Sequence, residues 1–445
     1  MSRASSRETK FVNRDQYTKR FTVRLVLLAL CCWTAPASAH NPALDPPEPG
    51  SVPEAWNVIT QCSANVQTLI DTNQLREIAY QIANTTPAIR LLKSRIGEMK
   101  DAEKVSTALD RMSNAGAAVI IAARQPNDPR NSALDAYHNL QDAVKSAAAF
   151  YPPEVVNAAV YICPMHPKDR HLNSDERCSL CKMPLIKRRI VASSIYEKPG
   201  ESSIVMSAEP DKSVQQGKSS RVTIRLSRRD GSPVLPGDLL VMHTQRIHLL
   251  IVDQTLADYH HEHPTATDTP GEYIFTFSPS KPGAYRIFAD VVPAASCIQE
   301  YVVADLKSDS AGGQIDDRAT ELKTTLDEMQ FKLSFDPKAL PLRAGEPVLG
   351  ELTVTAADGK PYRGLEPVMG AFGHFVGFNE DHATVVHVHP AGVEPTDPKQ
   401  RGGPTLPFFL YAPKPGYMRF YAQVRVEGVD RFVPFGLNIA EAGQR

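Results

Sequence analysis

Two different spacings of hydrophobic residues divide the chain, and each predicts its own kind of structure. Between residues 53 and 151, apolar side chains recur at steps of three and four residues, which is the pattern of amphipathic helices. Short polar joins divide this region into four such stretches, so we predict an N-terminal four-helix bundle of the up-and-down kind. The pair Thr86-Pro87 predicts a break or kink in the second helix, because Pro lacks the backbone N–H that a helix interior needs.

From residue 200 onward the hydrophobic period changes to two, which is typical of antiparallel strands with one buried face. Gly and Pro turns separate the alternating runs, and this arrangement predicts two tandem immunoglobulin-like β-sandwiches over residues 200–306 and 328–441. The polar, charged stretch between them reads as a linker. The predicted fold class is therefore multidomain α + β. The clearest alternating runs are Val222, Ile224, Leu226 and Tyr273, Phe275, Phe277.

The β region is duplicated, because the same landmarks occur twice in the same order. They are Asp230-Gly-Ser-Pro233 and Asp358-Gly-Lys-Pro361, Val241-Met242 and Val368-Met369, and Lys281-Pro-Gly283 and Lys414-Pro-Gly416. Ordered matches of this kind indicate two homologous copies.

Each copy also contains a histidine triplet. His248 precedes His261 and His263 in the first copy, and His374 precedes His387 and His389 at the same spacing in the second. Residues two apart in a strand point to the same face, so a hairpin would bring the three imidazoles of a copy together. Three imidazoles suit zinc or copper. The other interpretations are a buried polar network and a transient docking site for metal. Additional possible ligands are Met242 and Met369 in matching places, and His243 and His260, which have no matching imidazole in the second copy.

The first residues have the pattern of a secretory signal. A basic segment precedes the apolar run of residues 25–33, and Ala37-Ser-Ala39 follows as a cleavage signal, so we predict a signal peptide over residues 1–39 and a Pro-rich linker over residues 40–52. The expected location is periplasmic or secreted. An uncleaved anchor is the alternative, although the apolar run is short for a membrane span. After cleavage we expect no integral membrane segment.

The charge balance gives no sign of a polyanionic partner. The formal net charge of the 445 residues is −1, which predicts no nucleic-acid binding.

The densest group of metal-ligand residues lies in residues 158–188. Cys163-x-x-His166 and Cys178-x-x-Cys181 are separated by eleven residues, and two such knuckles can close a tetrahedral site. So short a segment buries little apolar surface, and a structural metal would supply about 10 kcal/mol of folding free energy. Open alternatives are a purely structural zinc and a Cys178–Cys181 disulfide. Cys62 and Cys297 either pair in a disulfide or are small buried hydrophobic residues.

Two thioethers, Met165 and Met183, each lie beside one of these ligand pairs. They favour copper(I) or silver(I) over zinc, or else pack in the core of the hairpin.

Residues 160–186 resemble the heavy-metal-binding domain, whose pattern is Y-x-C-P-M-H-P followed by C-P-x-C-G-M-x-L. That domain occurs in periplasmic adaptors of copper/silver efflux systems and in copper-exporting P-type ATPases. The resemblance implies a zinc-ribbon-like β-hairpin that holds copper(I), silver(I) or zinc(II). The chain departs from the pattern at Ser179, where the family has Pro, and at Lys182, where it has Gly. The matching candidate ligands are Cys163, Met165, His166, Cys178, Cys181 and Met183.

Three functions follow from these motifs. The first is an exported, non-enzymatic protein that sequesters copper, silver or zinc or hands it to a metal-efflux component. The second is a modular scaffold with a structural zinc site. The third is an enzyme with an open three-histidine metal site, for which Glu262 and Asp253 are the available acids. We find no nucleophile elbow or phosphate loop, which favours the non-enzymatic interpretation.

Overall fold

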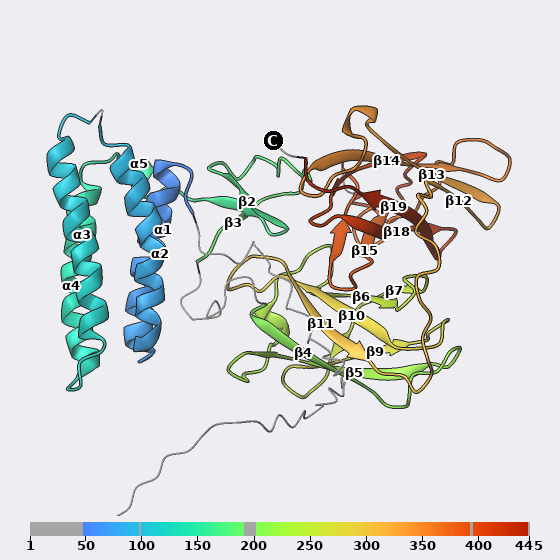
Figure 1. The fold of residues 1–445 in the computed structure, drawn as a ribbon, viewed down its shortest axis with the longest axis horizontal. Coiled ribbons are helices and arrows are strands. Elements are labelled where there is room, and N and C mark those ends of the chain that lie inside the picture. Colours follow the sequence, from blue (N-terminus) through green and yellow to red (C-terminus); the bar gives the residue numbers. More distant parts are fainter. Residues whose placement is uncertain (1–47, 98, 191–201, 392–394, 444–445) are drawn as a thin grey trace, which may run out of the picture. The chain divides into compact units, whose positions relative to one another are not determined.

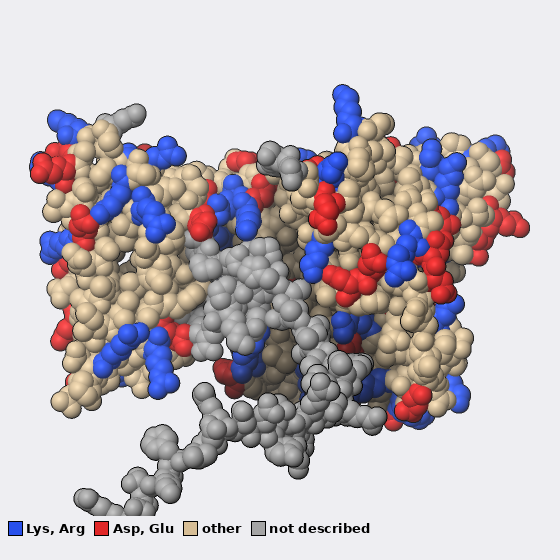
Figure 2. Space-filling view, viewed as in Figure 1, with Lys and Arg blue, Asp and Glu red and all other residues tan. Residues whose placement is uncertain are grey.

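Helices come first along the chain and antiparallel sheets follow, in a multidomain α + β arrangement that is mostly β (Figure 1). The computed structural model describes residues 48–97, 99–190, 202–391 and 395–443, which all belong to one unit spanning Ser38–Arg445. The predicted signal peptide lies outside the described residues. Within them, no helix combines the length and the apolar content needed to cross a membrane. On the face in Figure 2, cationic and anionic side chains are interspersed rather than gathered by sign.

The helical region has one apolar core, to which α1 to α4 all contribute. Trp56 and Val66 of α1 are fully buried in it, together with Leu109 of α3. The predicted break in the second helix is wrong, because α2 continues through Pro87, and apolar residues after the proline are buried in the same core. The helices are α1 Val52–Asp71, α2 Ile78–Ser94, α3 Ala102–Ala122, α4 Pro129–Ala148 and α5 Pro153–Val156, with short turns η2 Leu75–Glu77, η3 Pro236–Asp238 and η4 Pro337–Ala339.

A small three-stranded sheet follows the helices, with the strand order β2-β1-β3. Its strands are β1 Tyr161–Cys163, β2 His166–His171 and β3 Ile186–Lys187. Its core consists of the three motif cysteines together with Met183 and Leu185. We call residues 161–187 the hairpin.

Each repeat consists of two four-stranded antiparallel sheets around its own apolar core. In repeat 1 the sheets are β4-β5-β9-β8 and β11-β10-β6-β7; in repeat 2 they are β12-β13-β14-β17 and β16-β15-β18-β19. β12 lies before residue 328, the start that the sequence predicted for the second sandwich. The strands of repeat 1 are β4 Ile204–Pro210, β5 Ser220–Arg228, β6 Ile247–Asp253, β7 Tyr259–Glu262, β8 Thr265–Ala266, β9 Glu272–Phe277, β10 Tyr285–Val291 and β11 Glu300–Leu306. Those of repeat 2 are β12 Lys323–Leu326, β13 Met329–Phe335, β14 Pro347–Thr355, β15 His374–Asn379, β16 Val385–Val388, β17 Thr405–Tyr411, β18 Gly416–Val426 and β19 Val429–Ile439.

A separate apolar cluster joins the two repeats. It contains Leu250, Val252, Tyr259 and Phe288 of repeat 1, and among others Phe378 of repeat 2. The strands β6 and β15 are consequently buried along their whole length, with one face toward their own core and the other toward the opposite repeat. The period of two then places His248 on the same face as Leu250, and therefore at the junction between the repeats.

Candidate metal centres

The backbone of the hairpin positions two ligand knuckles. Cys163 and His166 are opposite partners at the turn between β1 and β2. The second knuckle closes through two backbone hydrogen bonds, from Lys182 N–H to the Cys178 carbonyl (2.9 Å) and from Cys178 N–H to the Met183 carbonyl (3.0 Å). Lys182 adopts a φ of 62°, the left-handed conformation that Gly adopts most easily. This is the position at which the heavy-metal-binding pattern has Gly.

The other departure from that pattern also has a structural role. Ser179 donates its backbone N–H and its hydroxyl to the two carboxylate oxygens of Asp169, at 2.6 and 2.7 Å. Pro could make neither of these hydrogen bonds. The serine therefore ties the second knuckle to β2.

The four hairpin ligands converge on one point, with ligand atoms within 4.8 Å of one another. The Sγ atoms of Cys163 and Cys181 are 3.5 Å apart, and His166 Nδ1 lies 3.5 Å from Cys178 Sγ and 3.8 Å from Cys163 Sγ. A tetrahedron with metal–sulfur bonds of about 2.3 Å has edges of about 3.8 Å, so the spacing fits a single ion. The three cysteines are buried.

Hydrogen bonding among the three cysteines favours the thiolate form of one of them. Hydrogen bonds from the Cys163 and Cys181 thiols lower the pKa of Cys178. Hydrogen bonding to Cys178 raises the pKa of Cys163 to about 12, and hydrogen bonding to Cys163 and then to Cys178 raises the pKa of Cys181. A lowered thiol pKa favours the anionic form that binds soft cations.

In repeat 1, the paired strands β6 and β7 bring His248, His261 and His263 together. His248 donates through Nε2 to the Met242 carbonyl (3.0 Å), and His261 donates through Nδ1 to the Gln423 side-chain oxygen (2.8 Å). The remaining nitrogens, His248 Nδ1 and His261 Nε2, lie 3.1 Å apart, and His263 Nε2 is 3.2 Å from His248 Nδ1.

Repeat 2 repeats this arrangement on β15 and β16 with His374, His387 and His389. His374 donates through Nε2 to the Val368 carbonyl (3.0 Å), and His387 donates through Nδ1 to Asp290 (2.8 Å). His374 Nδ1, His387 Nε2 and both nitrogens of His389 are buried without a hydrogen-bond partner.

These outer hydrogen bonds leave lone pairs facing inward. A neutral imidazole has one N–H. In each triad, two rings donate this N–H to an oxygen acceptor outside the triad. Two unprotonated nitrogens about 3.1 Å apart repel one another unless a cation lies between them. In a tetrahedral site with metal–nitrogen bonds of about 2.0 Å, the nitrogens are about 3.3 Å apart, which is close to this spacing. The donor set therefore fits a metal ion in each triad.

Burial disfavours protonation of six imidazoles in and beside the triads. Desolvation lowers the pKa of His243, His248 and His263 to about 4, and it lowers the pKa of His261, His374 and His389 well below the ordinary value. Neutral imidazole is the form that binds metals.

The same shifts predict acid sensitivity of the metal-free protein. Because the unfolded chain binds protons near pH 6.5 and the folded chain only near pH 4, the free energy of unfolding should fall as pH falls through this range, by on the order of 3 kcal/mol for one such ring. Urea denaturation with a chelator measures it. His263→Ala should make the profile shallower, whereas His138→Ala, on the exposed face of α4, should not. Identical profiles for both variants would contradict this assignment.

The turns before the triads correct the predicted alignment of the repeats. Met242 and Val368 both open a tight turn, and each accepts the hydrogen bond of the histidine six residues later. Met242 therefore corresponds to Val368 rather than to Met369, and His243 corresponds to Met369, so it still has no matching imidazole. Both His243 (φ 46°) and Met369 (φ 49°) are held in a left-handed conformation that is costly for non-Gly residues and is often found at functional sites.

His260 points away from both triads. It lies 3.1 Å from Asp258 and packs against Phe277 and Tyr285 in repeat 1.

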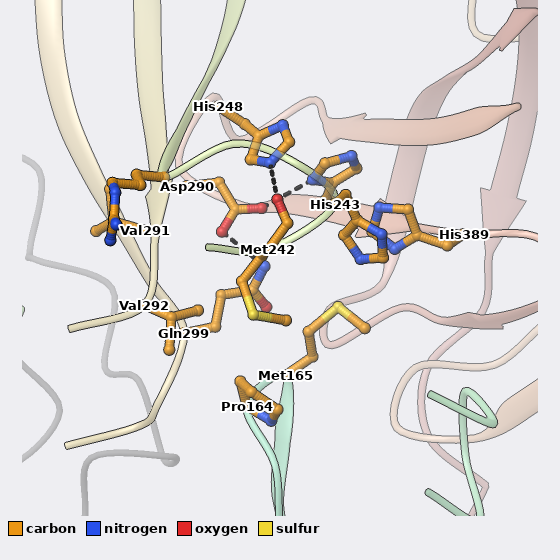
Figure 3. A pocket seen from close by; sticks show the side chains of 12 residues that line it. Pro164, Met165, Met242, His243, His248, Asp290, Val291, Val292, Gln299 and His389 are labelled. Carbon is orange, nitrogen blue, oxygen red and sulfur yellow. Dashed lines mark hydrogen bonds and ion pairs between the residues drawn. The ribbon is translucent and has the colours of Figure 1, made fainter. Parts of the chain in front are cut away.

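A pocket connects the hairpin with the histidines (Figure 3). Met165, which lies between the ligands Cys163 and His166 in sequence, extends into it, as does Met242. Histidines of both triads line the same pocket, together with His243. Its cavity volume of about 20 Å³ accommodates about one water molecule or one ion. Met183 is buried among the cysteines in the core of the hairpin, whereas Met165 is partly buried and packs against that core.

The five described cysteines are free thiols. Cys62 is buried in the core of the helical region, where burial raises its pKa to about 12. Cys297 is buried in repeat 1 and makes a weak hydrogen bond to the Ala294 carbonyl. The structure thus contains neither a Cys62–Cys297 nor a Cys178–Cys181 disulfide.

Sequence reasoning missed two residues that orient the triads, Asp290 and Gln423. A signal was present, because Ala289-Asp-Val291 matches Ala422-Gln-Val424 in the two copies. A polar residue between apolar ones in a strand buried on both faces indicates a buried partner.

One family model matches the chain. It is described as a domain of unknown function (DUF8832), and it matches residues 203–307 and again residues 324–441, so both repeats are copies of the same domain. No curated protein matches the chain significantly.

Several solved structures share limited similarity with the chain. A putative membrane-anchored protein from Corynebacterium diphtheriae is 10% identical over 53% of this chain and 59% of its own, with a TM-score of 0.17. InvD from Yersinia pseudotuberculosis is 14% identical over 54% and 58%, with a TM-score of 0.17. A β-glycosidase from Bacteroides vulgatus is 13% identical over 58% and 27%, with a TM-score of 0.15. The chain thus spans less than two thirds of each, and similarity at this level indicates no function.

Proposed function

We propose that this chain, which belongs to the DUF8832 family of unknown function, is an exported, non-enzymatic protein that sequesters copper, silver or zinc and hands the ion on. The observation that supports handing on is the shared pocket. Met165 lies between the hairpin ligands Cys163 and His166 in sequence, and it lines the same pocket as histidines of both triads.

The ligands offer a graded path for a thiophilic cation. Thiolates suit copper(I) and silver(I) best, thioethers bind them more weakly, and imidazoles suit copper and zinc. An ion can therefore exchange ligands one at a time between the hairpin and the histidines, through Met165, without changing its oxidation state. The small pocket volume leaves no room for an organic substrate, which supports a non-enzymatic role.

We interpret the hairpin as a zinc-ribbon-like heavy-metal-binding domain, which the left-handed Lys182 supports. We interpret the four long helices as an up-and-down bundle and the repeats as immunoglobulin-like sandwiches. The expected recipient of the ion is a metal-efflux component.

A structural zinc in a scaffold is the second candidate, and the contacts of the hairpin favour it. Gln299 of repeat 1 donates its N–H to the Pro164 carbonyl (3.0 Å), and the Lys182 ammonium lies 5.3 Å from the centre of the Phe409 ring of repeat 2. Arg170 of β2 forms an ion pair with Glu54 of α1 (2.7 Å). The hairpin thus contacts the helical region and both repeats, as a staple would.

The rate at which the hairpin releases its ion separates the two candidates. The experiment uses the reduced full chain loaded with one equivalent of copper(I). Met165→Leu should slow removal of the copper by a competing copper(I) chelator at least about tenfold, because the intermediate thioether ligand is lost. A tenfold change in rate corresponds to about 1.4 kcal/mol in the activation barrier for release. Equilibrium affinity should stay within a few fold of the original.

The control for this experiment is Met206→Leu, a buried methionine in the core of repeat 1. Release that is insensitive to Met165 and occurs only when the hairpin unfolds would support the structural zinc staple and overturn the handover.

A further inference from the structure

We infer that the two histidine triads form one dinuclear metal centre. In this centre a residue of each repeat orients the middle histidine of the other repeat's triad, which we call the central ligand (His261 in repeat 1 and His387 in repeat 2). This inference rests on metal binding by the triads, which the proposed function includes. It adds that the two sites are a single structure that neither repeat can complete alone.

The six rings are one cluster rather than two. Within repeat 1 the ring centres of His248 and His261 are 5.3 Å apart, and within repeat 2 those of His374 and His387 are 5.6 Å apart. Across the junction, His387 lies 5.4 Å from both His248 and His261. The separations between the triads thus match those within them, so two ions held there would be close neighbours.

The residues that orient the central histidines are exchanged between the repeats. His261 of repeat 1 donates to Gln423 of repeat 2, and His387 of repeat 2 donates to Asp290 of repeat 1, each at 2.8 Å. The amide orientation of Gln423 is fixed, because its nitrogen donates to Asp430 (3.2 Å) and its oxygen therefore faces His261.

Asp290 and Gln423 occupy equivalent positions in the two copies. Asp290 on β10 is the register partner of His248 on β6, and Gln423 on β18 is the partner of His374 on β15. Each repeat therefore uses the residue beside its own first ligand to orient the central ligand of the other repeat. The two hydrogen bonds are thus exchanged reciprocally between the repeats, and they form only when both repeats pack together.

The two halves of the centre differ in chemistry. A carboxylate behind a ligating imidazole makes that ligand more basic than an amide does, so the ion of repeat 2 should be held more tightly. His243 also stacks on His389, with ring centres 3.5 Å apart, and places a seventh imidazole beside the ion of repeat 2. Three imidazole nitrogens per ion with an open fourth position suit zinc or copper.

A zinc(II) titration of the full chain tests the inference, with the hairpin first filled by one equivalent of silver(I). Two further equivalents of zinc should bind. His263→Ala should leave only the ion of repeat 2, and His389→Ala should leave only that of repeat 1. Within the described residues, neither side chain has a hydrogen-bond partner outside its own triad, so its loss strands no buried group.

The crossed orientation predicts a crossed pattern of second substitutions. Asp290→Asn should weaken the remaining ion about 10- to 100-fold in the His263→Ala background and leave it unchanged in the His389→Ala background. Gln423→Met should do the reverse. A general loss of structure would weaken both backgrounds alike. Asp305→Asn, on the neighbouring strand β11 and half-exposed, is the matched control.

Copper(II) in place of zinc, in a chain with Cys163, Cys178 and Cys181 changed to Ser, provides a second readout. Two neighbouring copper(II) ions should give a dipole-coupled spectrum with a half-field transition in paramagnetic resonance. Binding of a single ion, uncoupled spectra or an uncrossed substitution pattern would overturn the dinuclear centre. Zinc bound by neither triad, with silver still held by the hairpin, would overturn this inference and leave the hairpin proposal standing.

Discussion

Replacing Cys178 by Ser should lower the affinity of the hairpin for copper(I) or silver(I) by more than about a thousandfold, equivalent to about 4 kcal/mol. Hydrogen bonds from its two cysteine neighbours lower the pKa of Cys178, which favours its thiolate form. A serine hydroxyl is uncharged near neutral pH and is a poor ligand for soft cations. Competition with a copper(I) chelator under reducing conditions measures the loss.

Cys297→Ser provides the matched control, since Cys297 is also a buried free thiol but lies in repeat 1, outside the hairpin. It should bind copper(I) as the original chain does. If Cys178→Ser retained the original affinity, the ion would have to be held elsewhere, and the hairpin could no longer be regarded as the site of capture.

The hairpin could be predicted from sequence because its ligands are local. Cys163, His166, Cys178 and Cys181 lie within nineteen consecutive residues, and the two-residue gaps alone determine that each pair turns toward one ion. The same holds for the members of one histidine triplet, since the alternation along a strand determines which imidazoles share a face.

The junction between the triads could not be predicted in this way. Whether His248 meets His387 depends on how two sandwiches pack, and that packing depends on the outer faces of β6 and β15. The signal for that packing is a run of apolar residues that lacks alternation, as in Leu249-Leu-Ile-Val252. Such a run indicates burial on both faces but does not identify the covering surface. The one-residue shift between Met242 and Met369 had a similar cause, because matching letters do not reveal which carbonyl accepts a hydrogen bond.

The apolar junction should therefore determine both stability and metal affinity, and Phe378→Ala should reduce both. The Phe378 ring of repeat 2 lies 5.3 Å from Tyr259 and 5.9 Å from Phe288 of repeat 1, centre to centre. Removing a fully buried aromatic ring of this kind costs about 3–5 kcal/mol of unfolding free energy. Because the junction also sets the distance from Asp290 to His387 and from Gln423 to His261, zinc binding by both triads should weaken at least about tenfold.

Phe408→Ala separates the two effects. Phe408 is equally buried, but it lies in the core of repeat 2 itself, where it packs on Phe375 with ring centres 4.3 Å apart. Its loss should lower the unfolding free energy by a similar amount while the folded protein keeps its zinc affinity. Chemical denaturation and zinc competition on both variants give the comparison. Equal effects of the two substitutions on zinc affinity would mean that the centre responds to general loosening of repeat 2, and that the crossed hydrogen bonds do not depend on the junction.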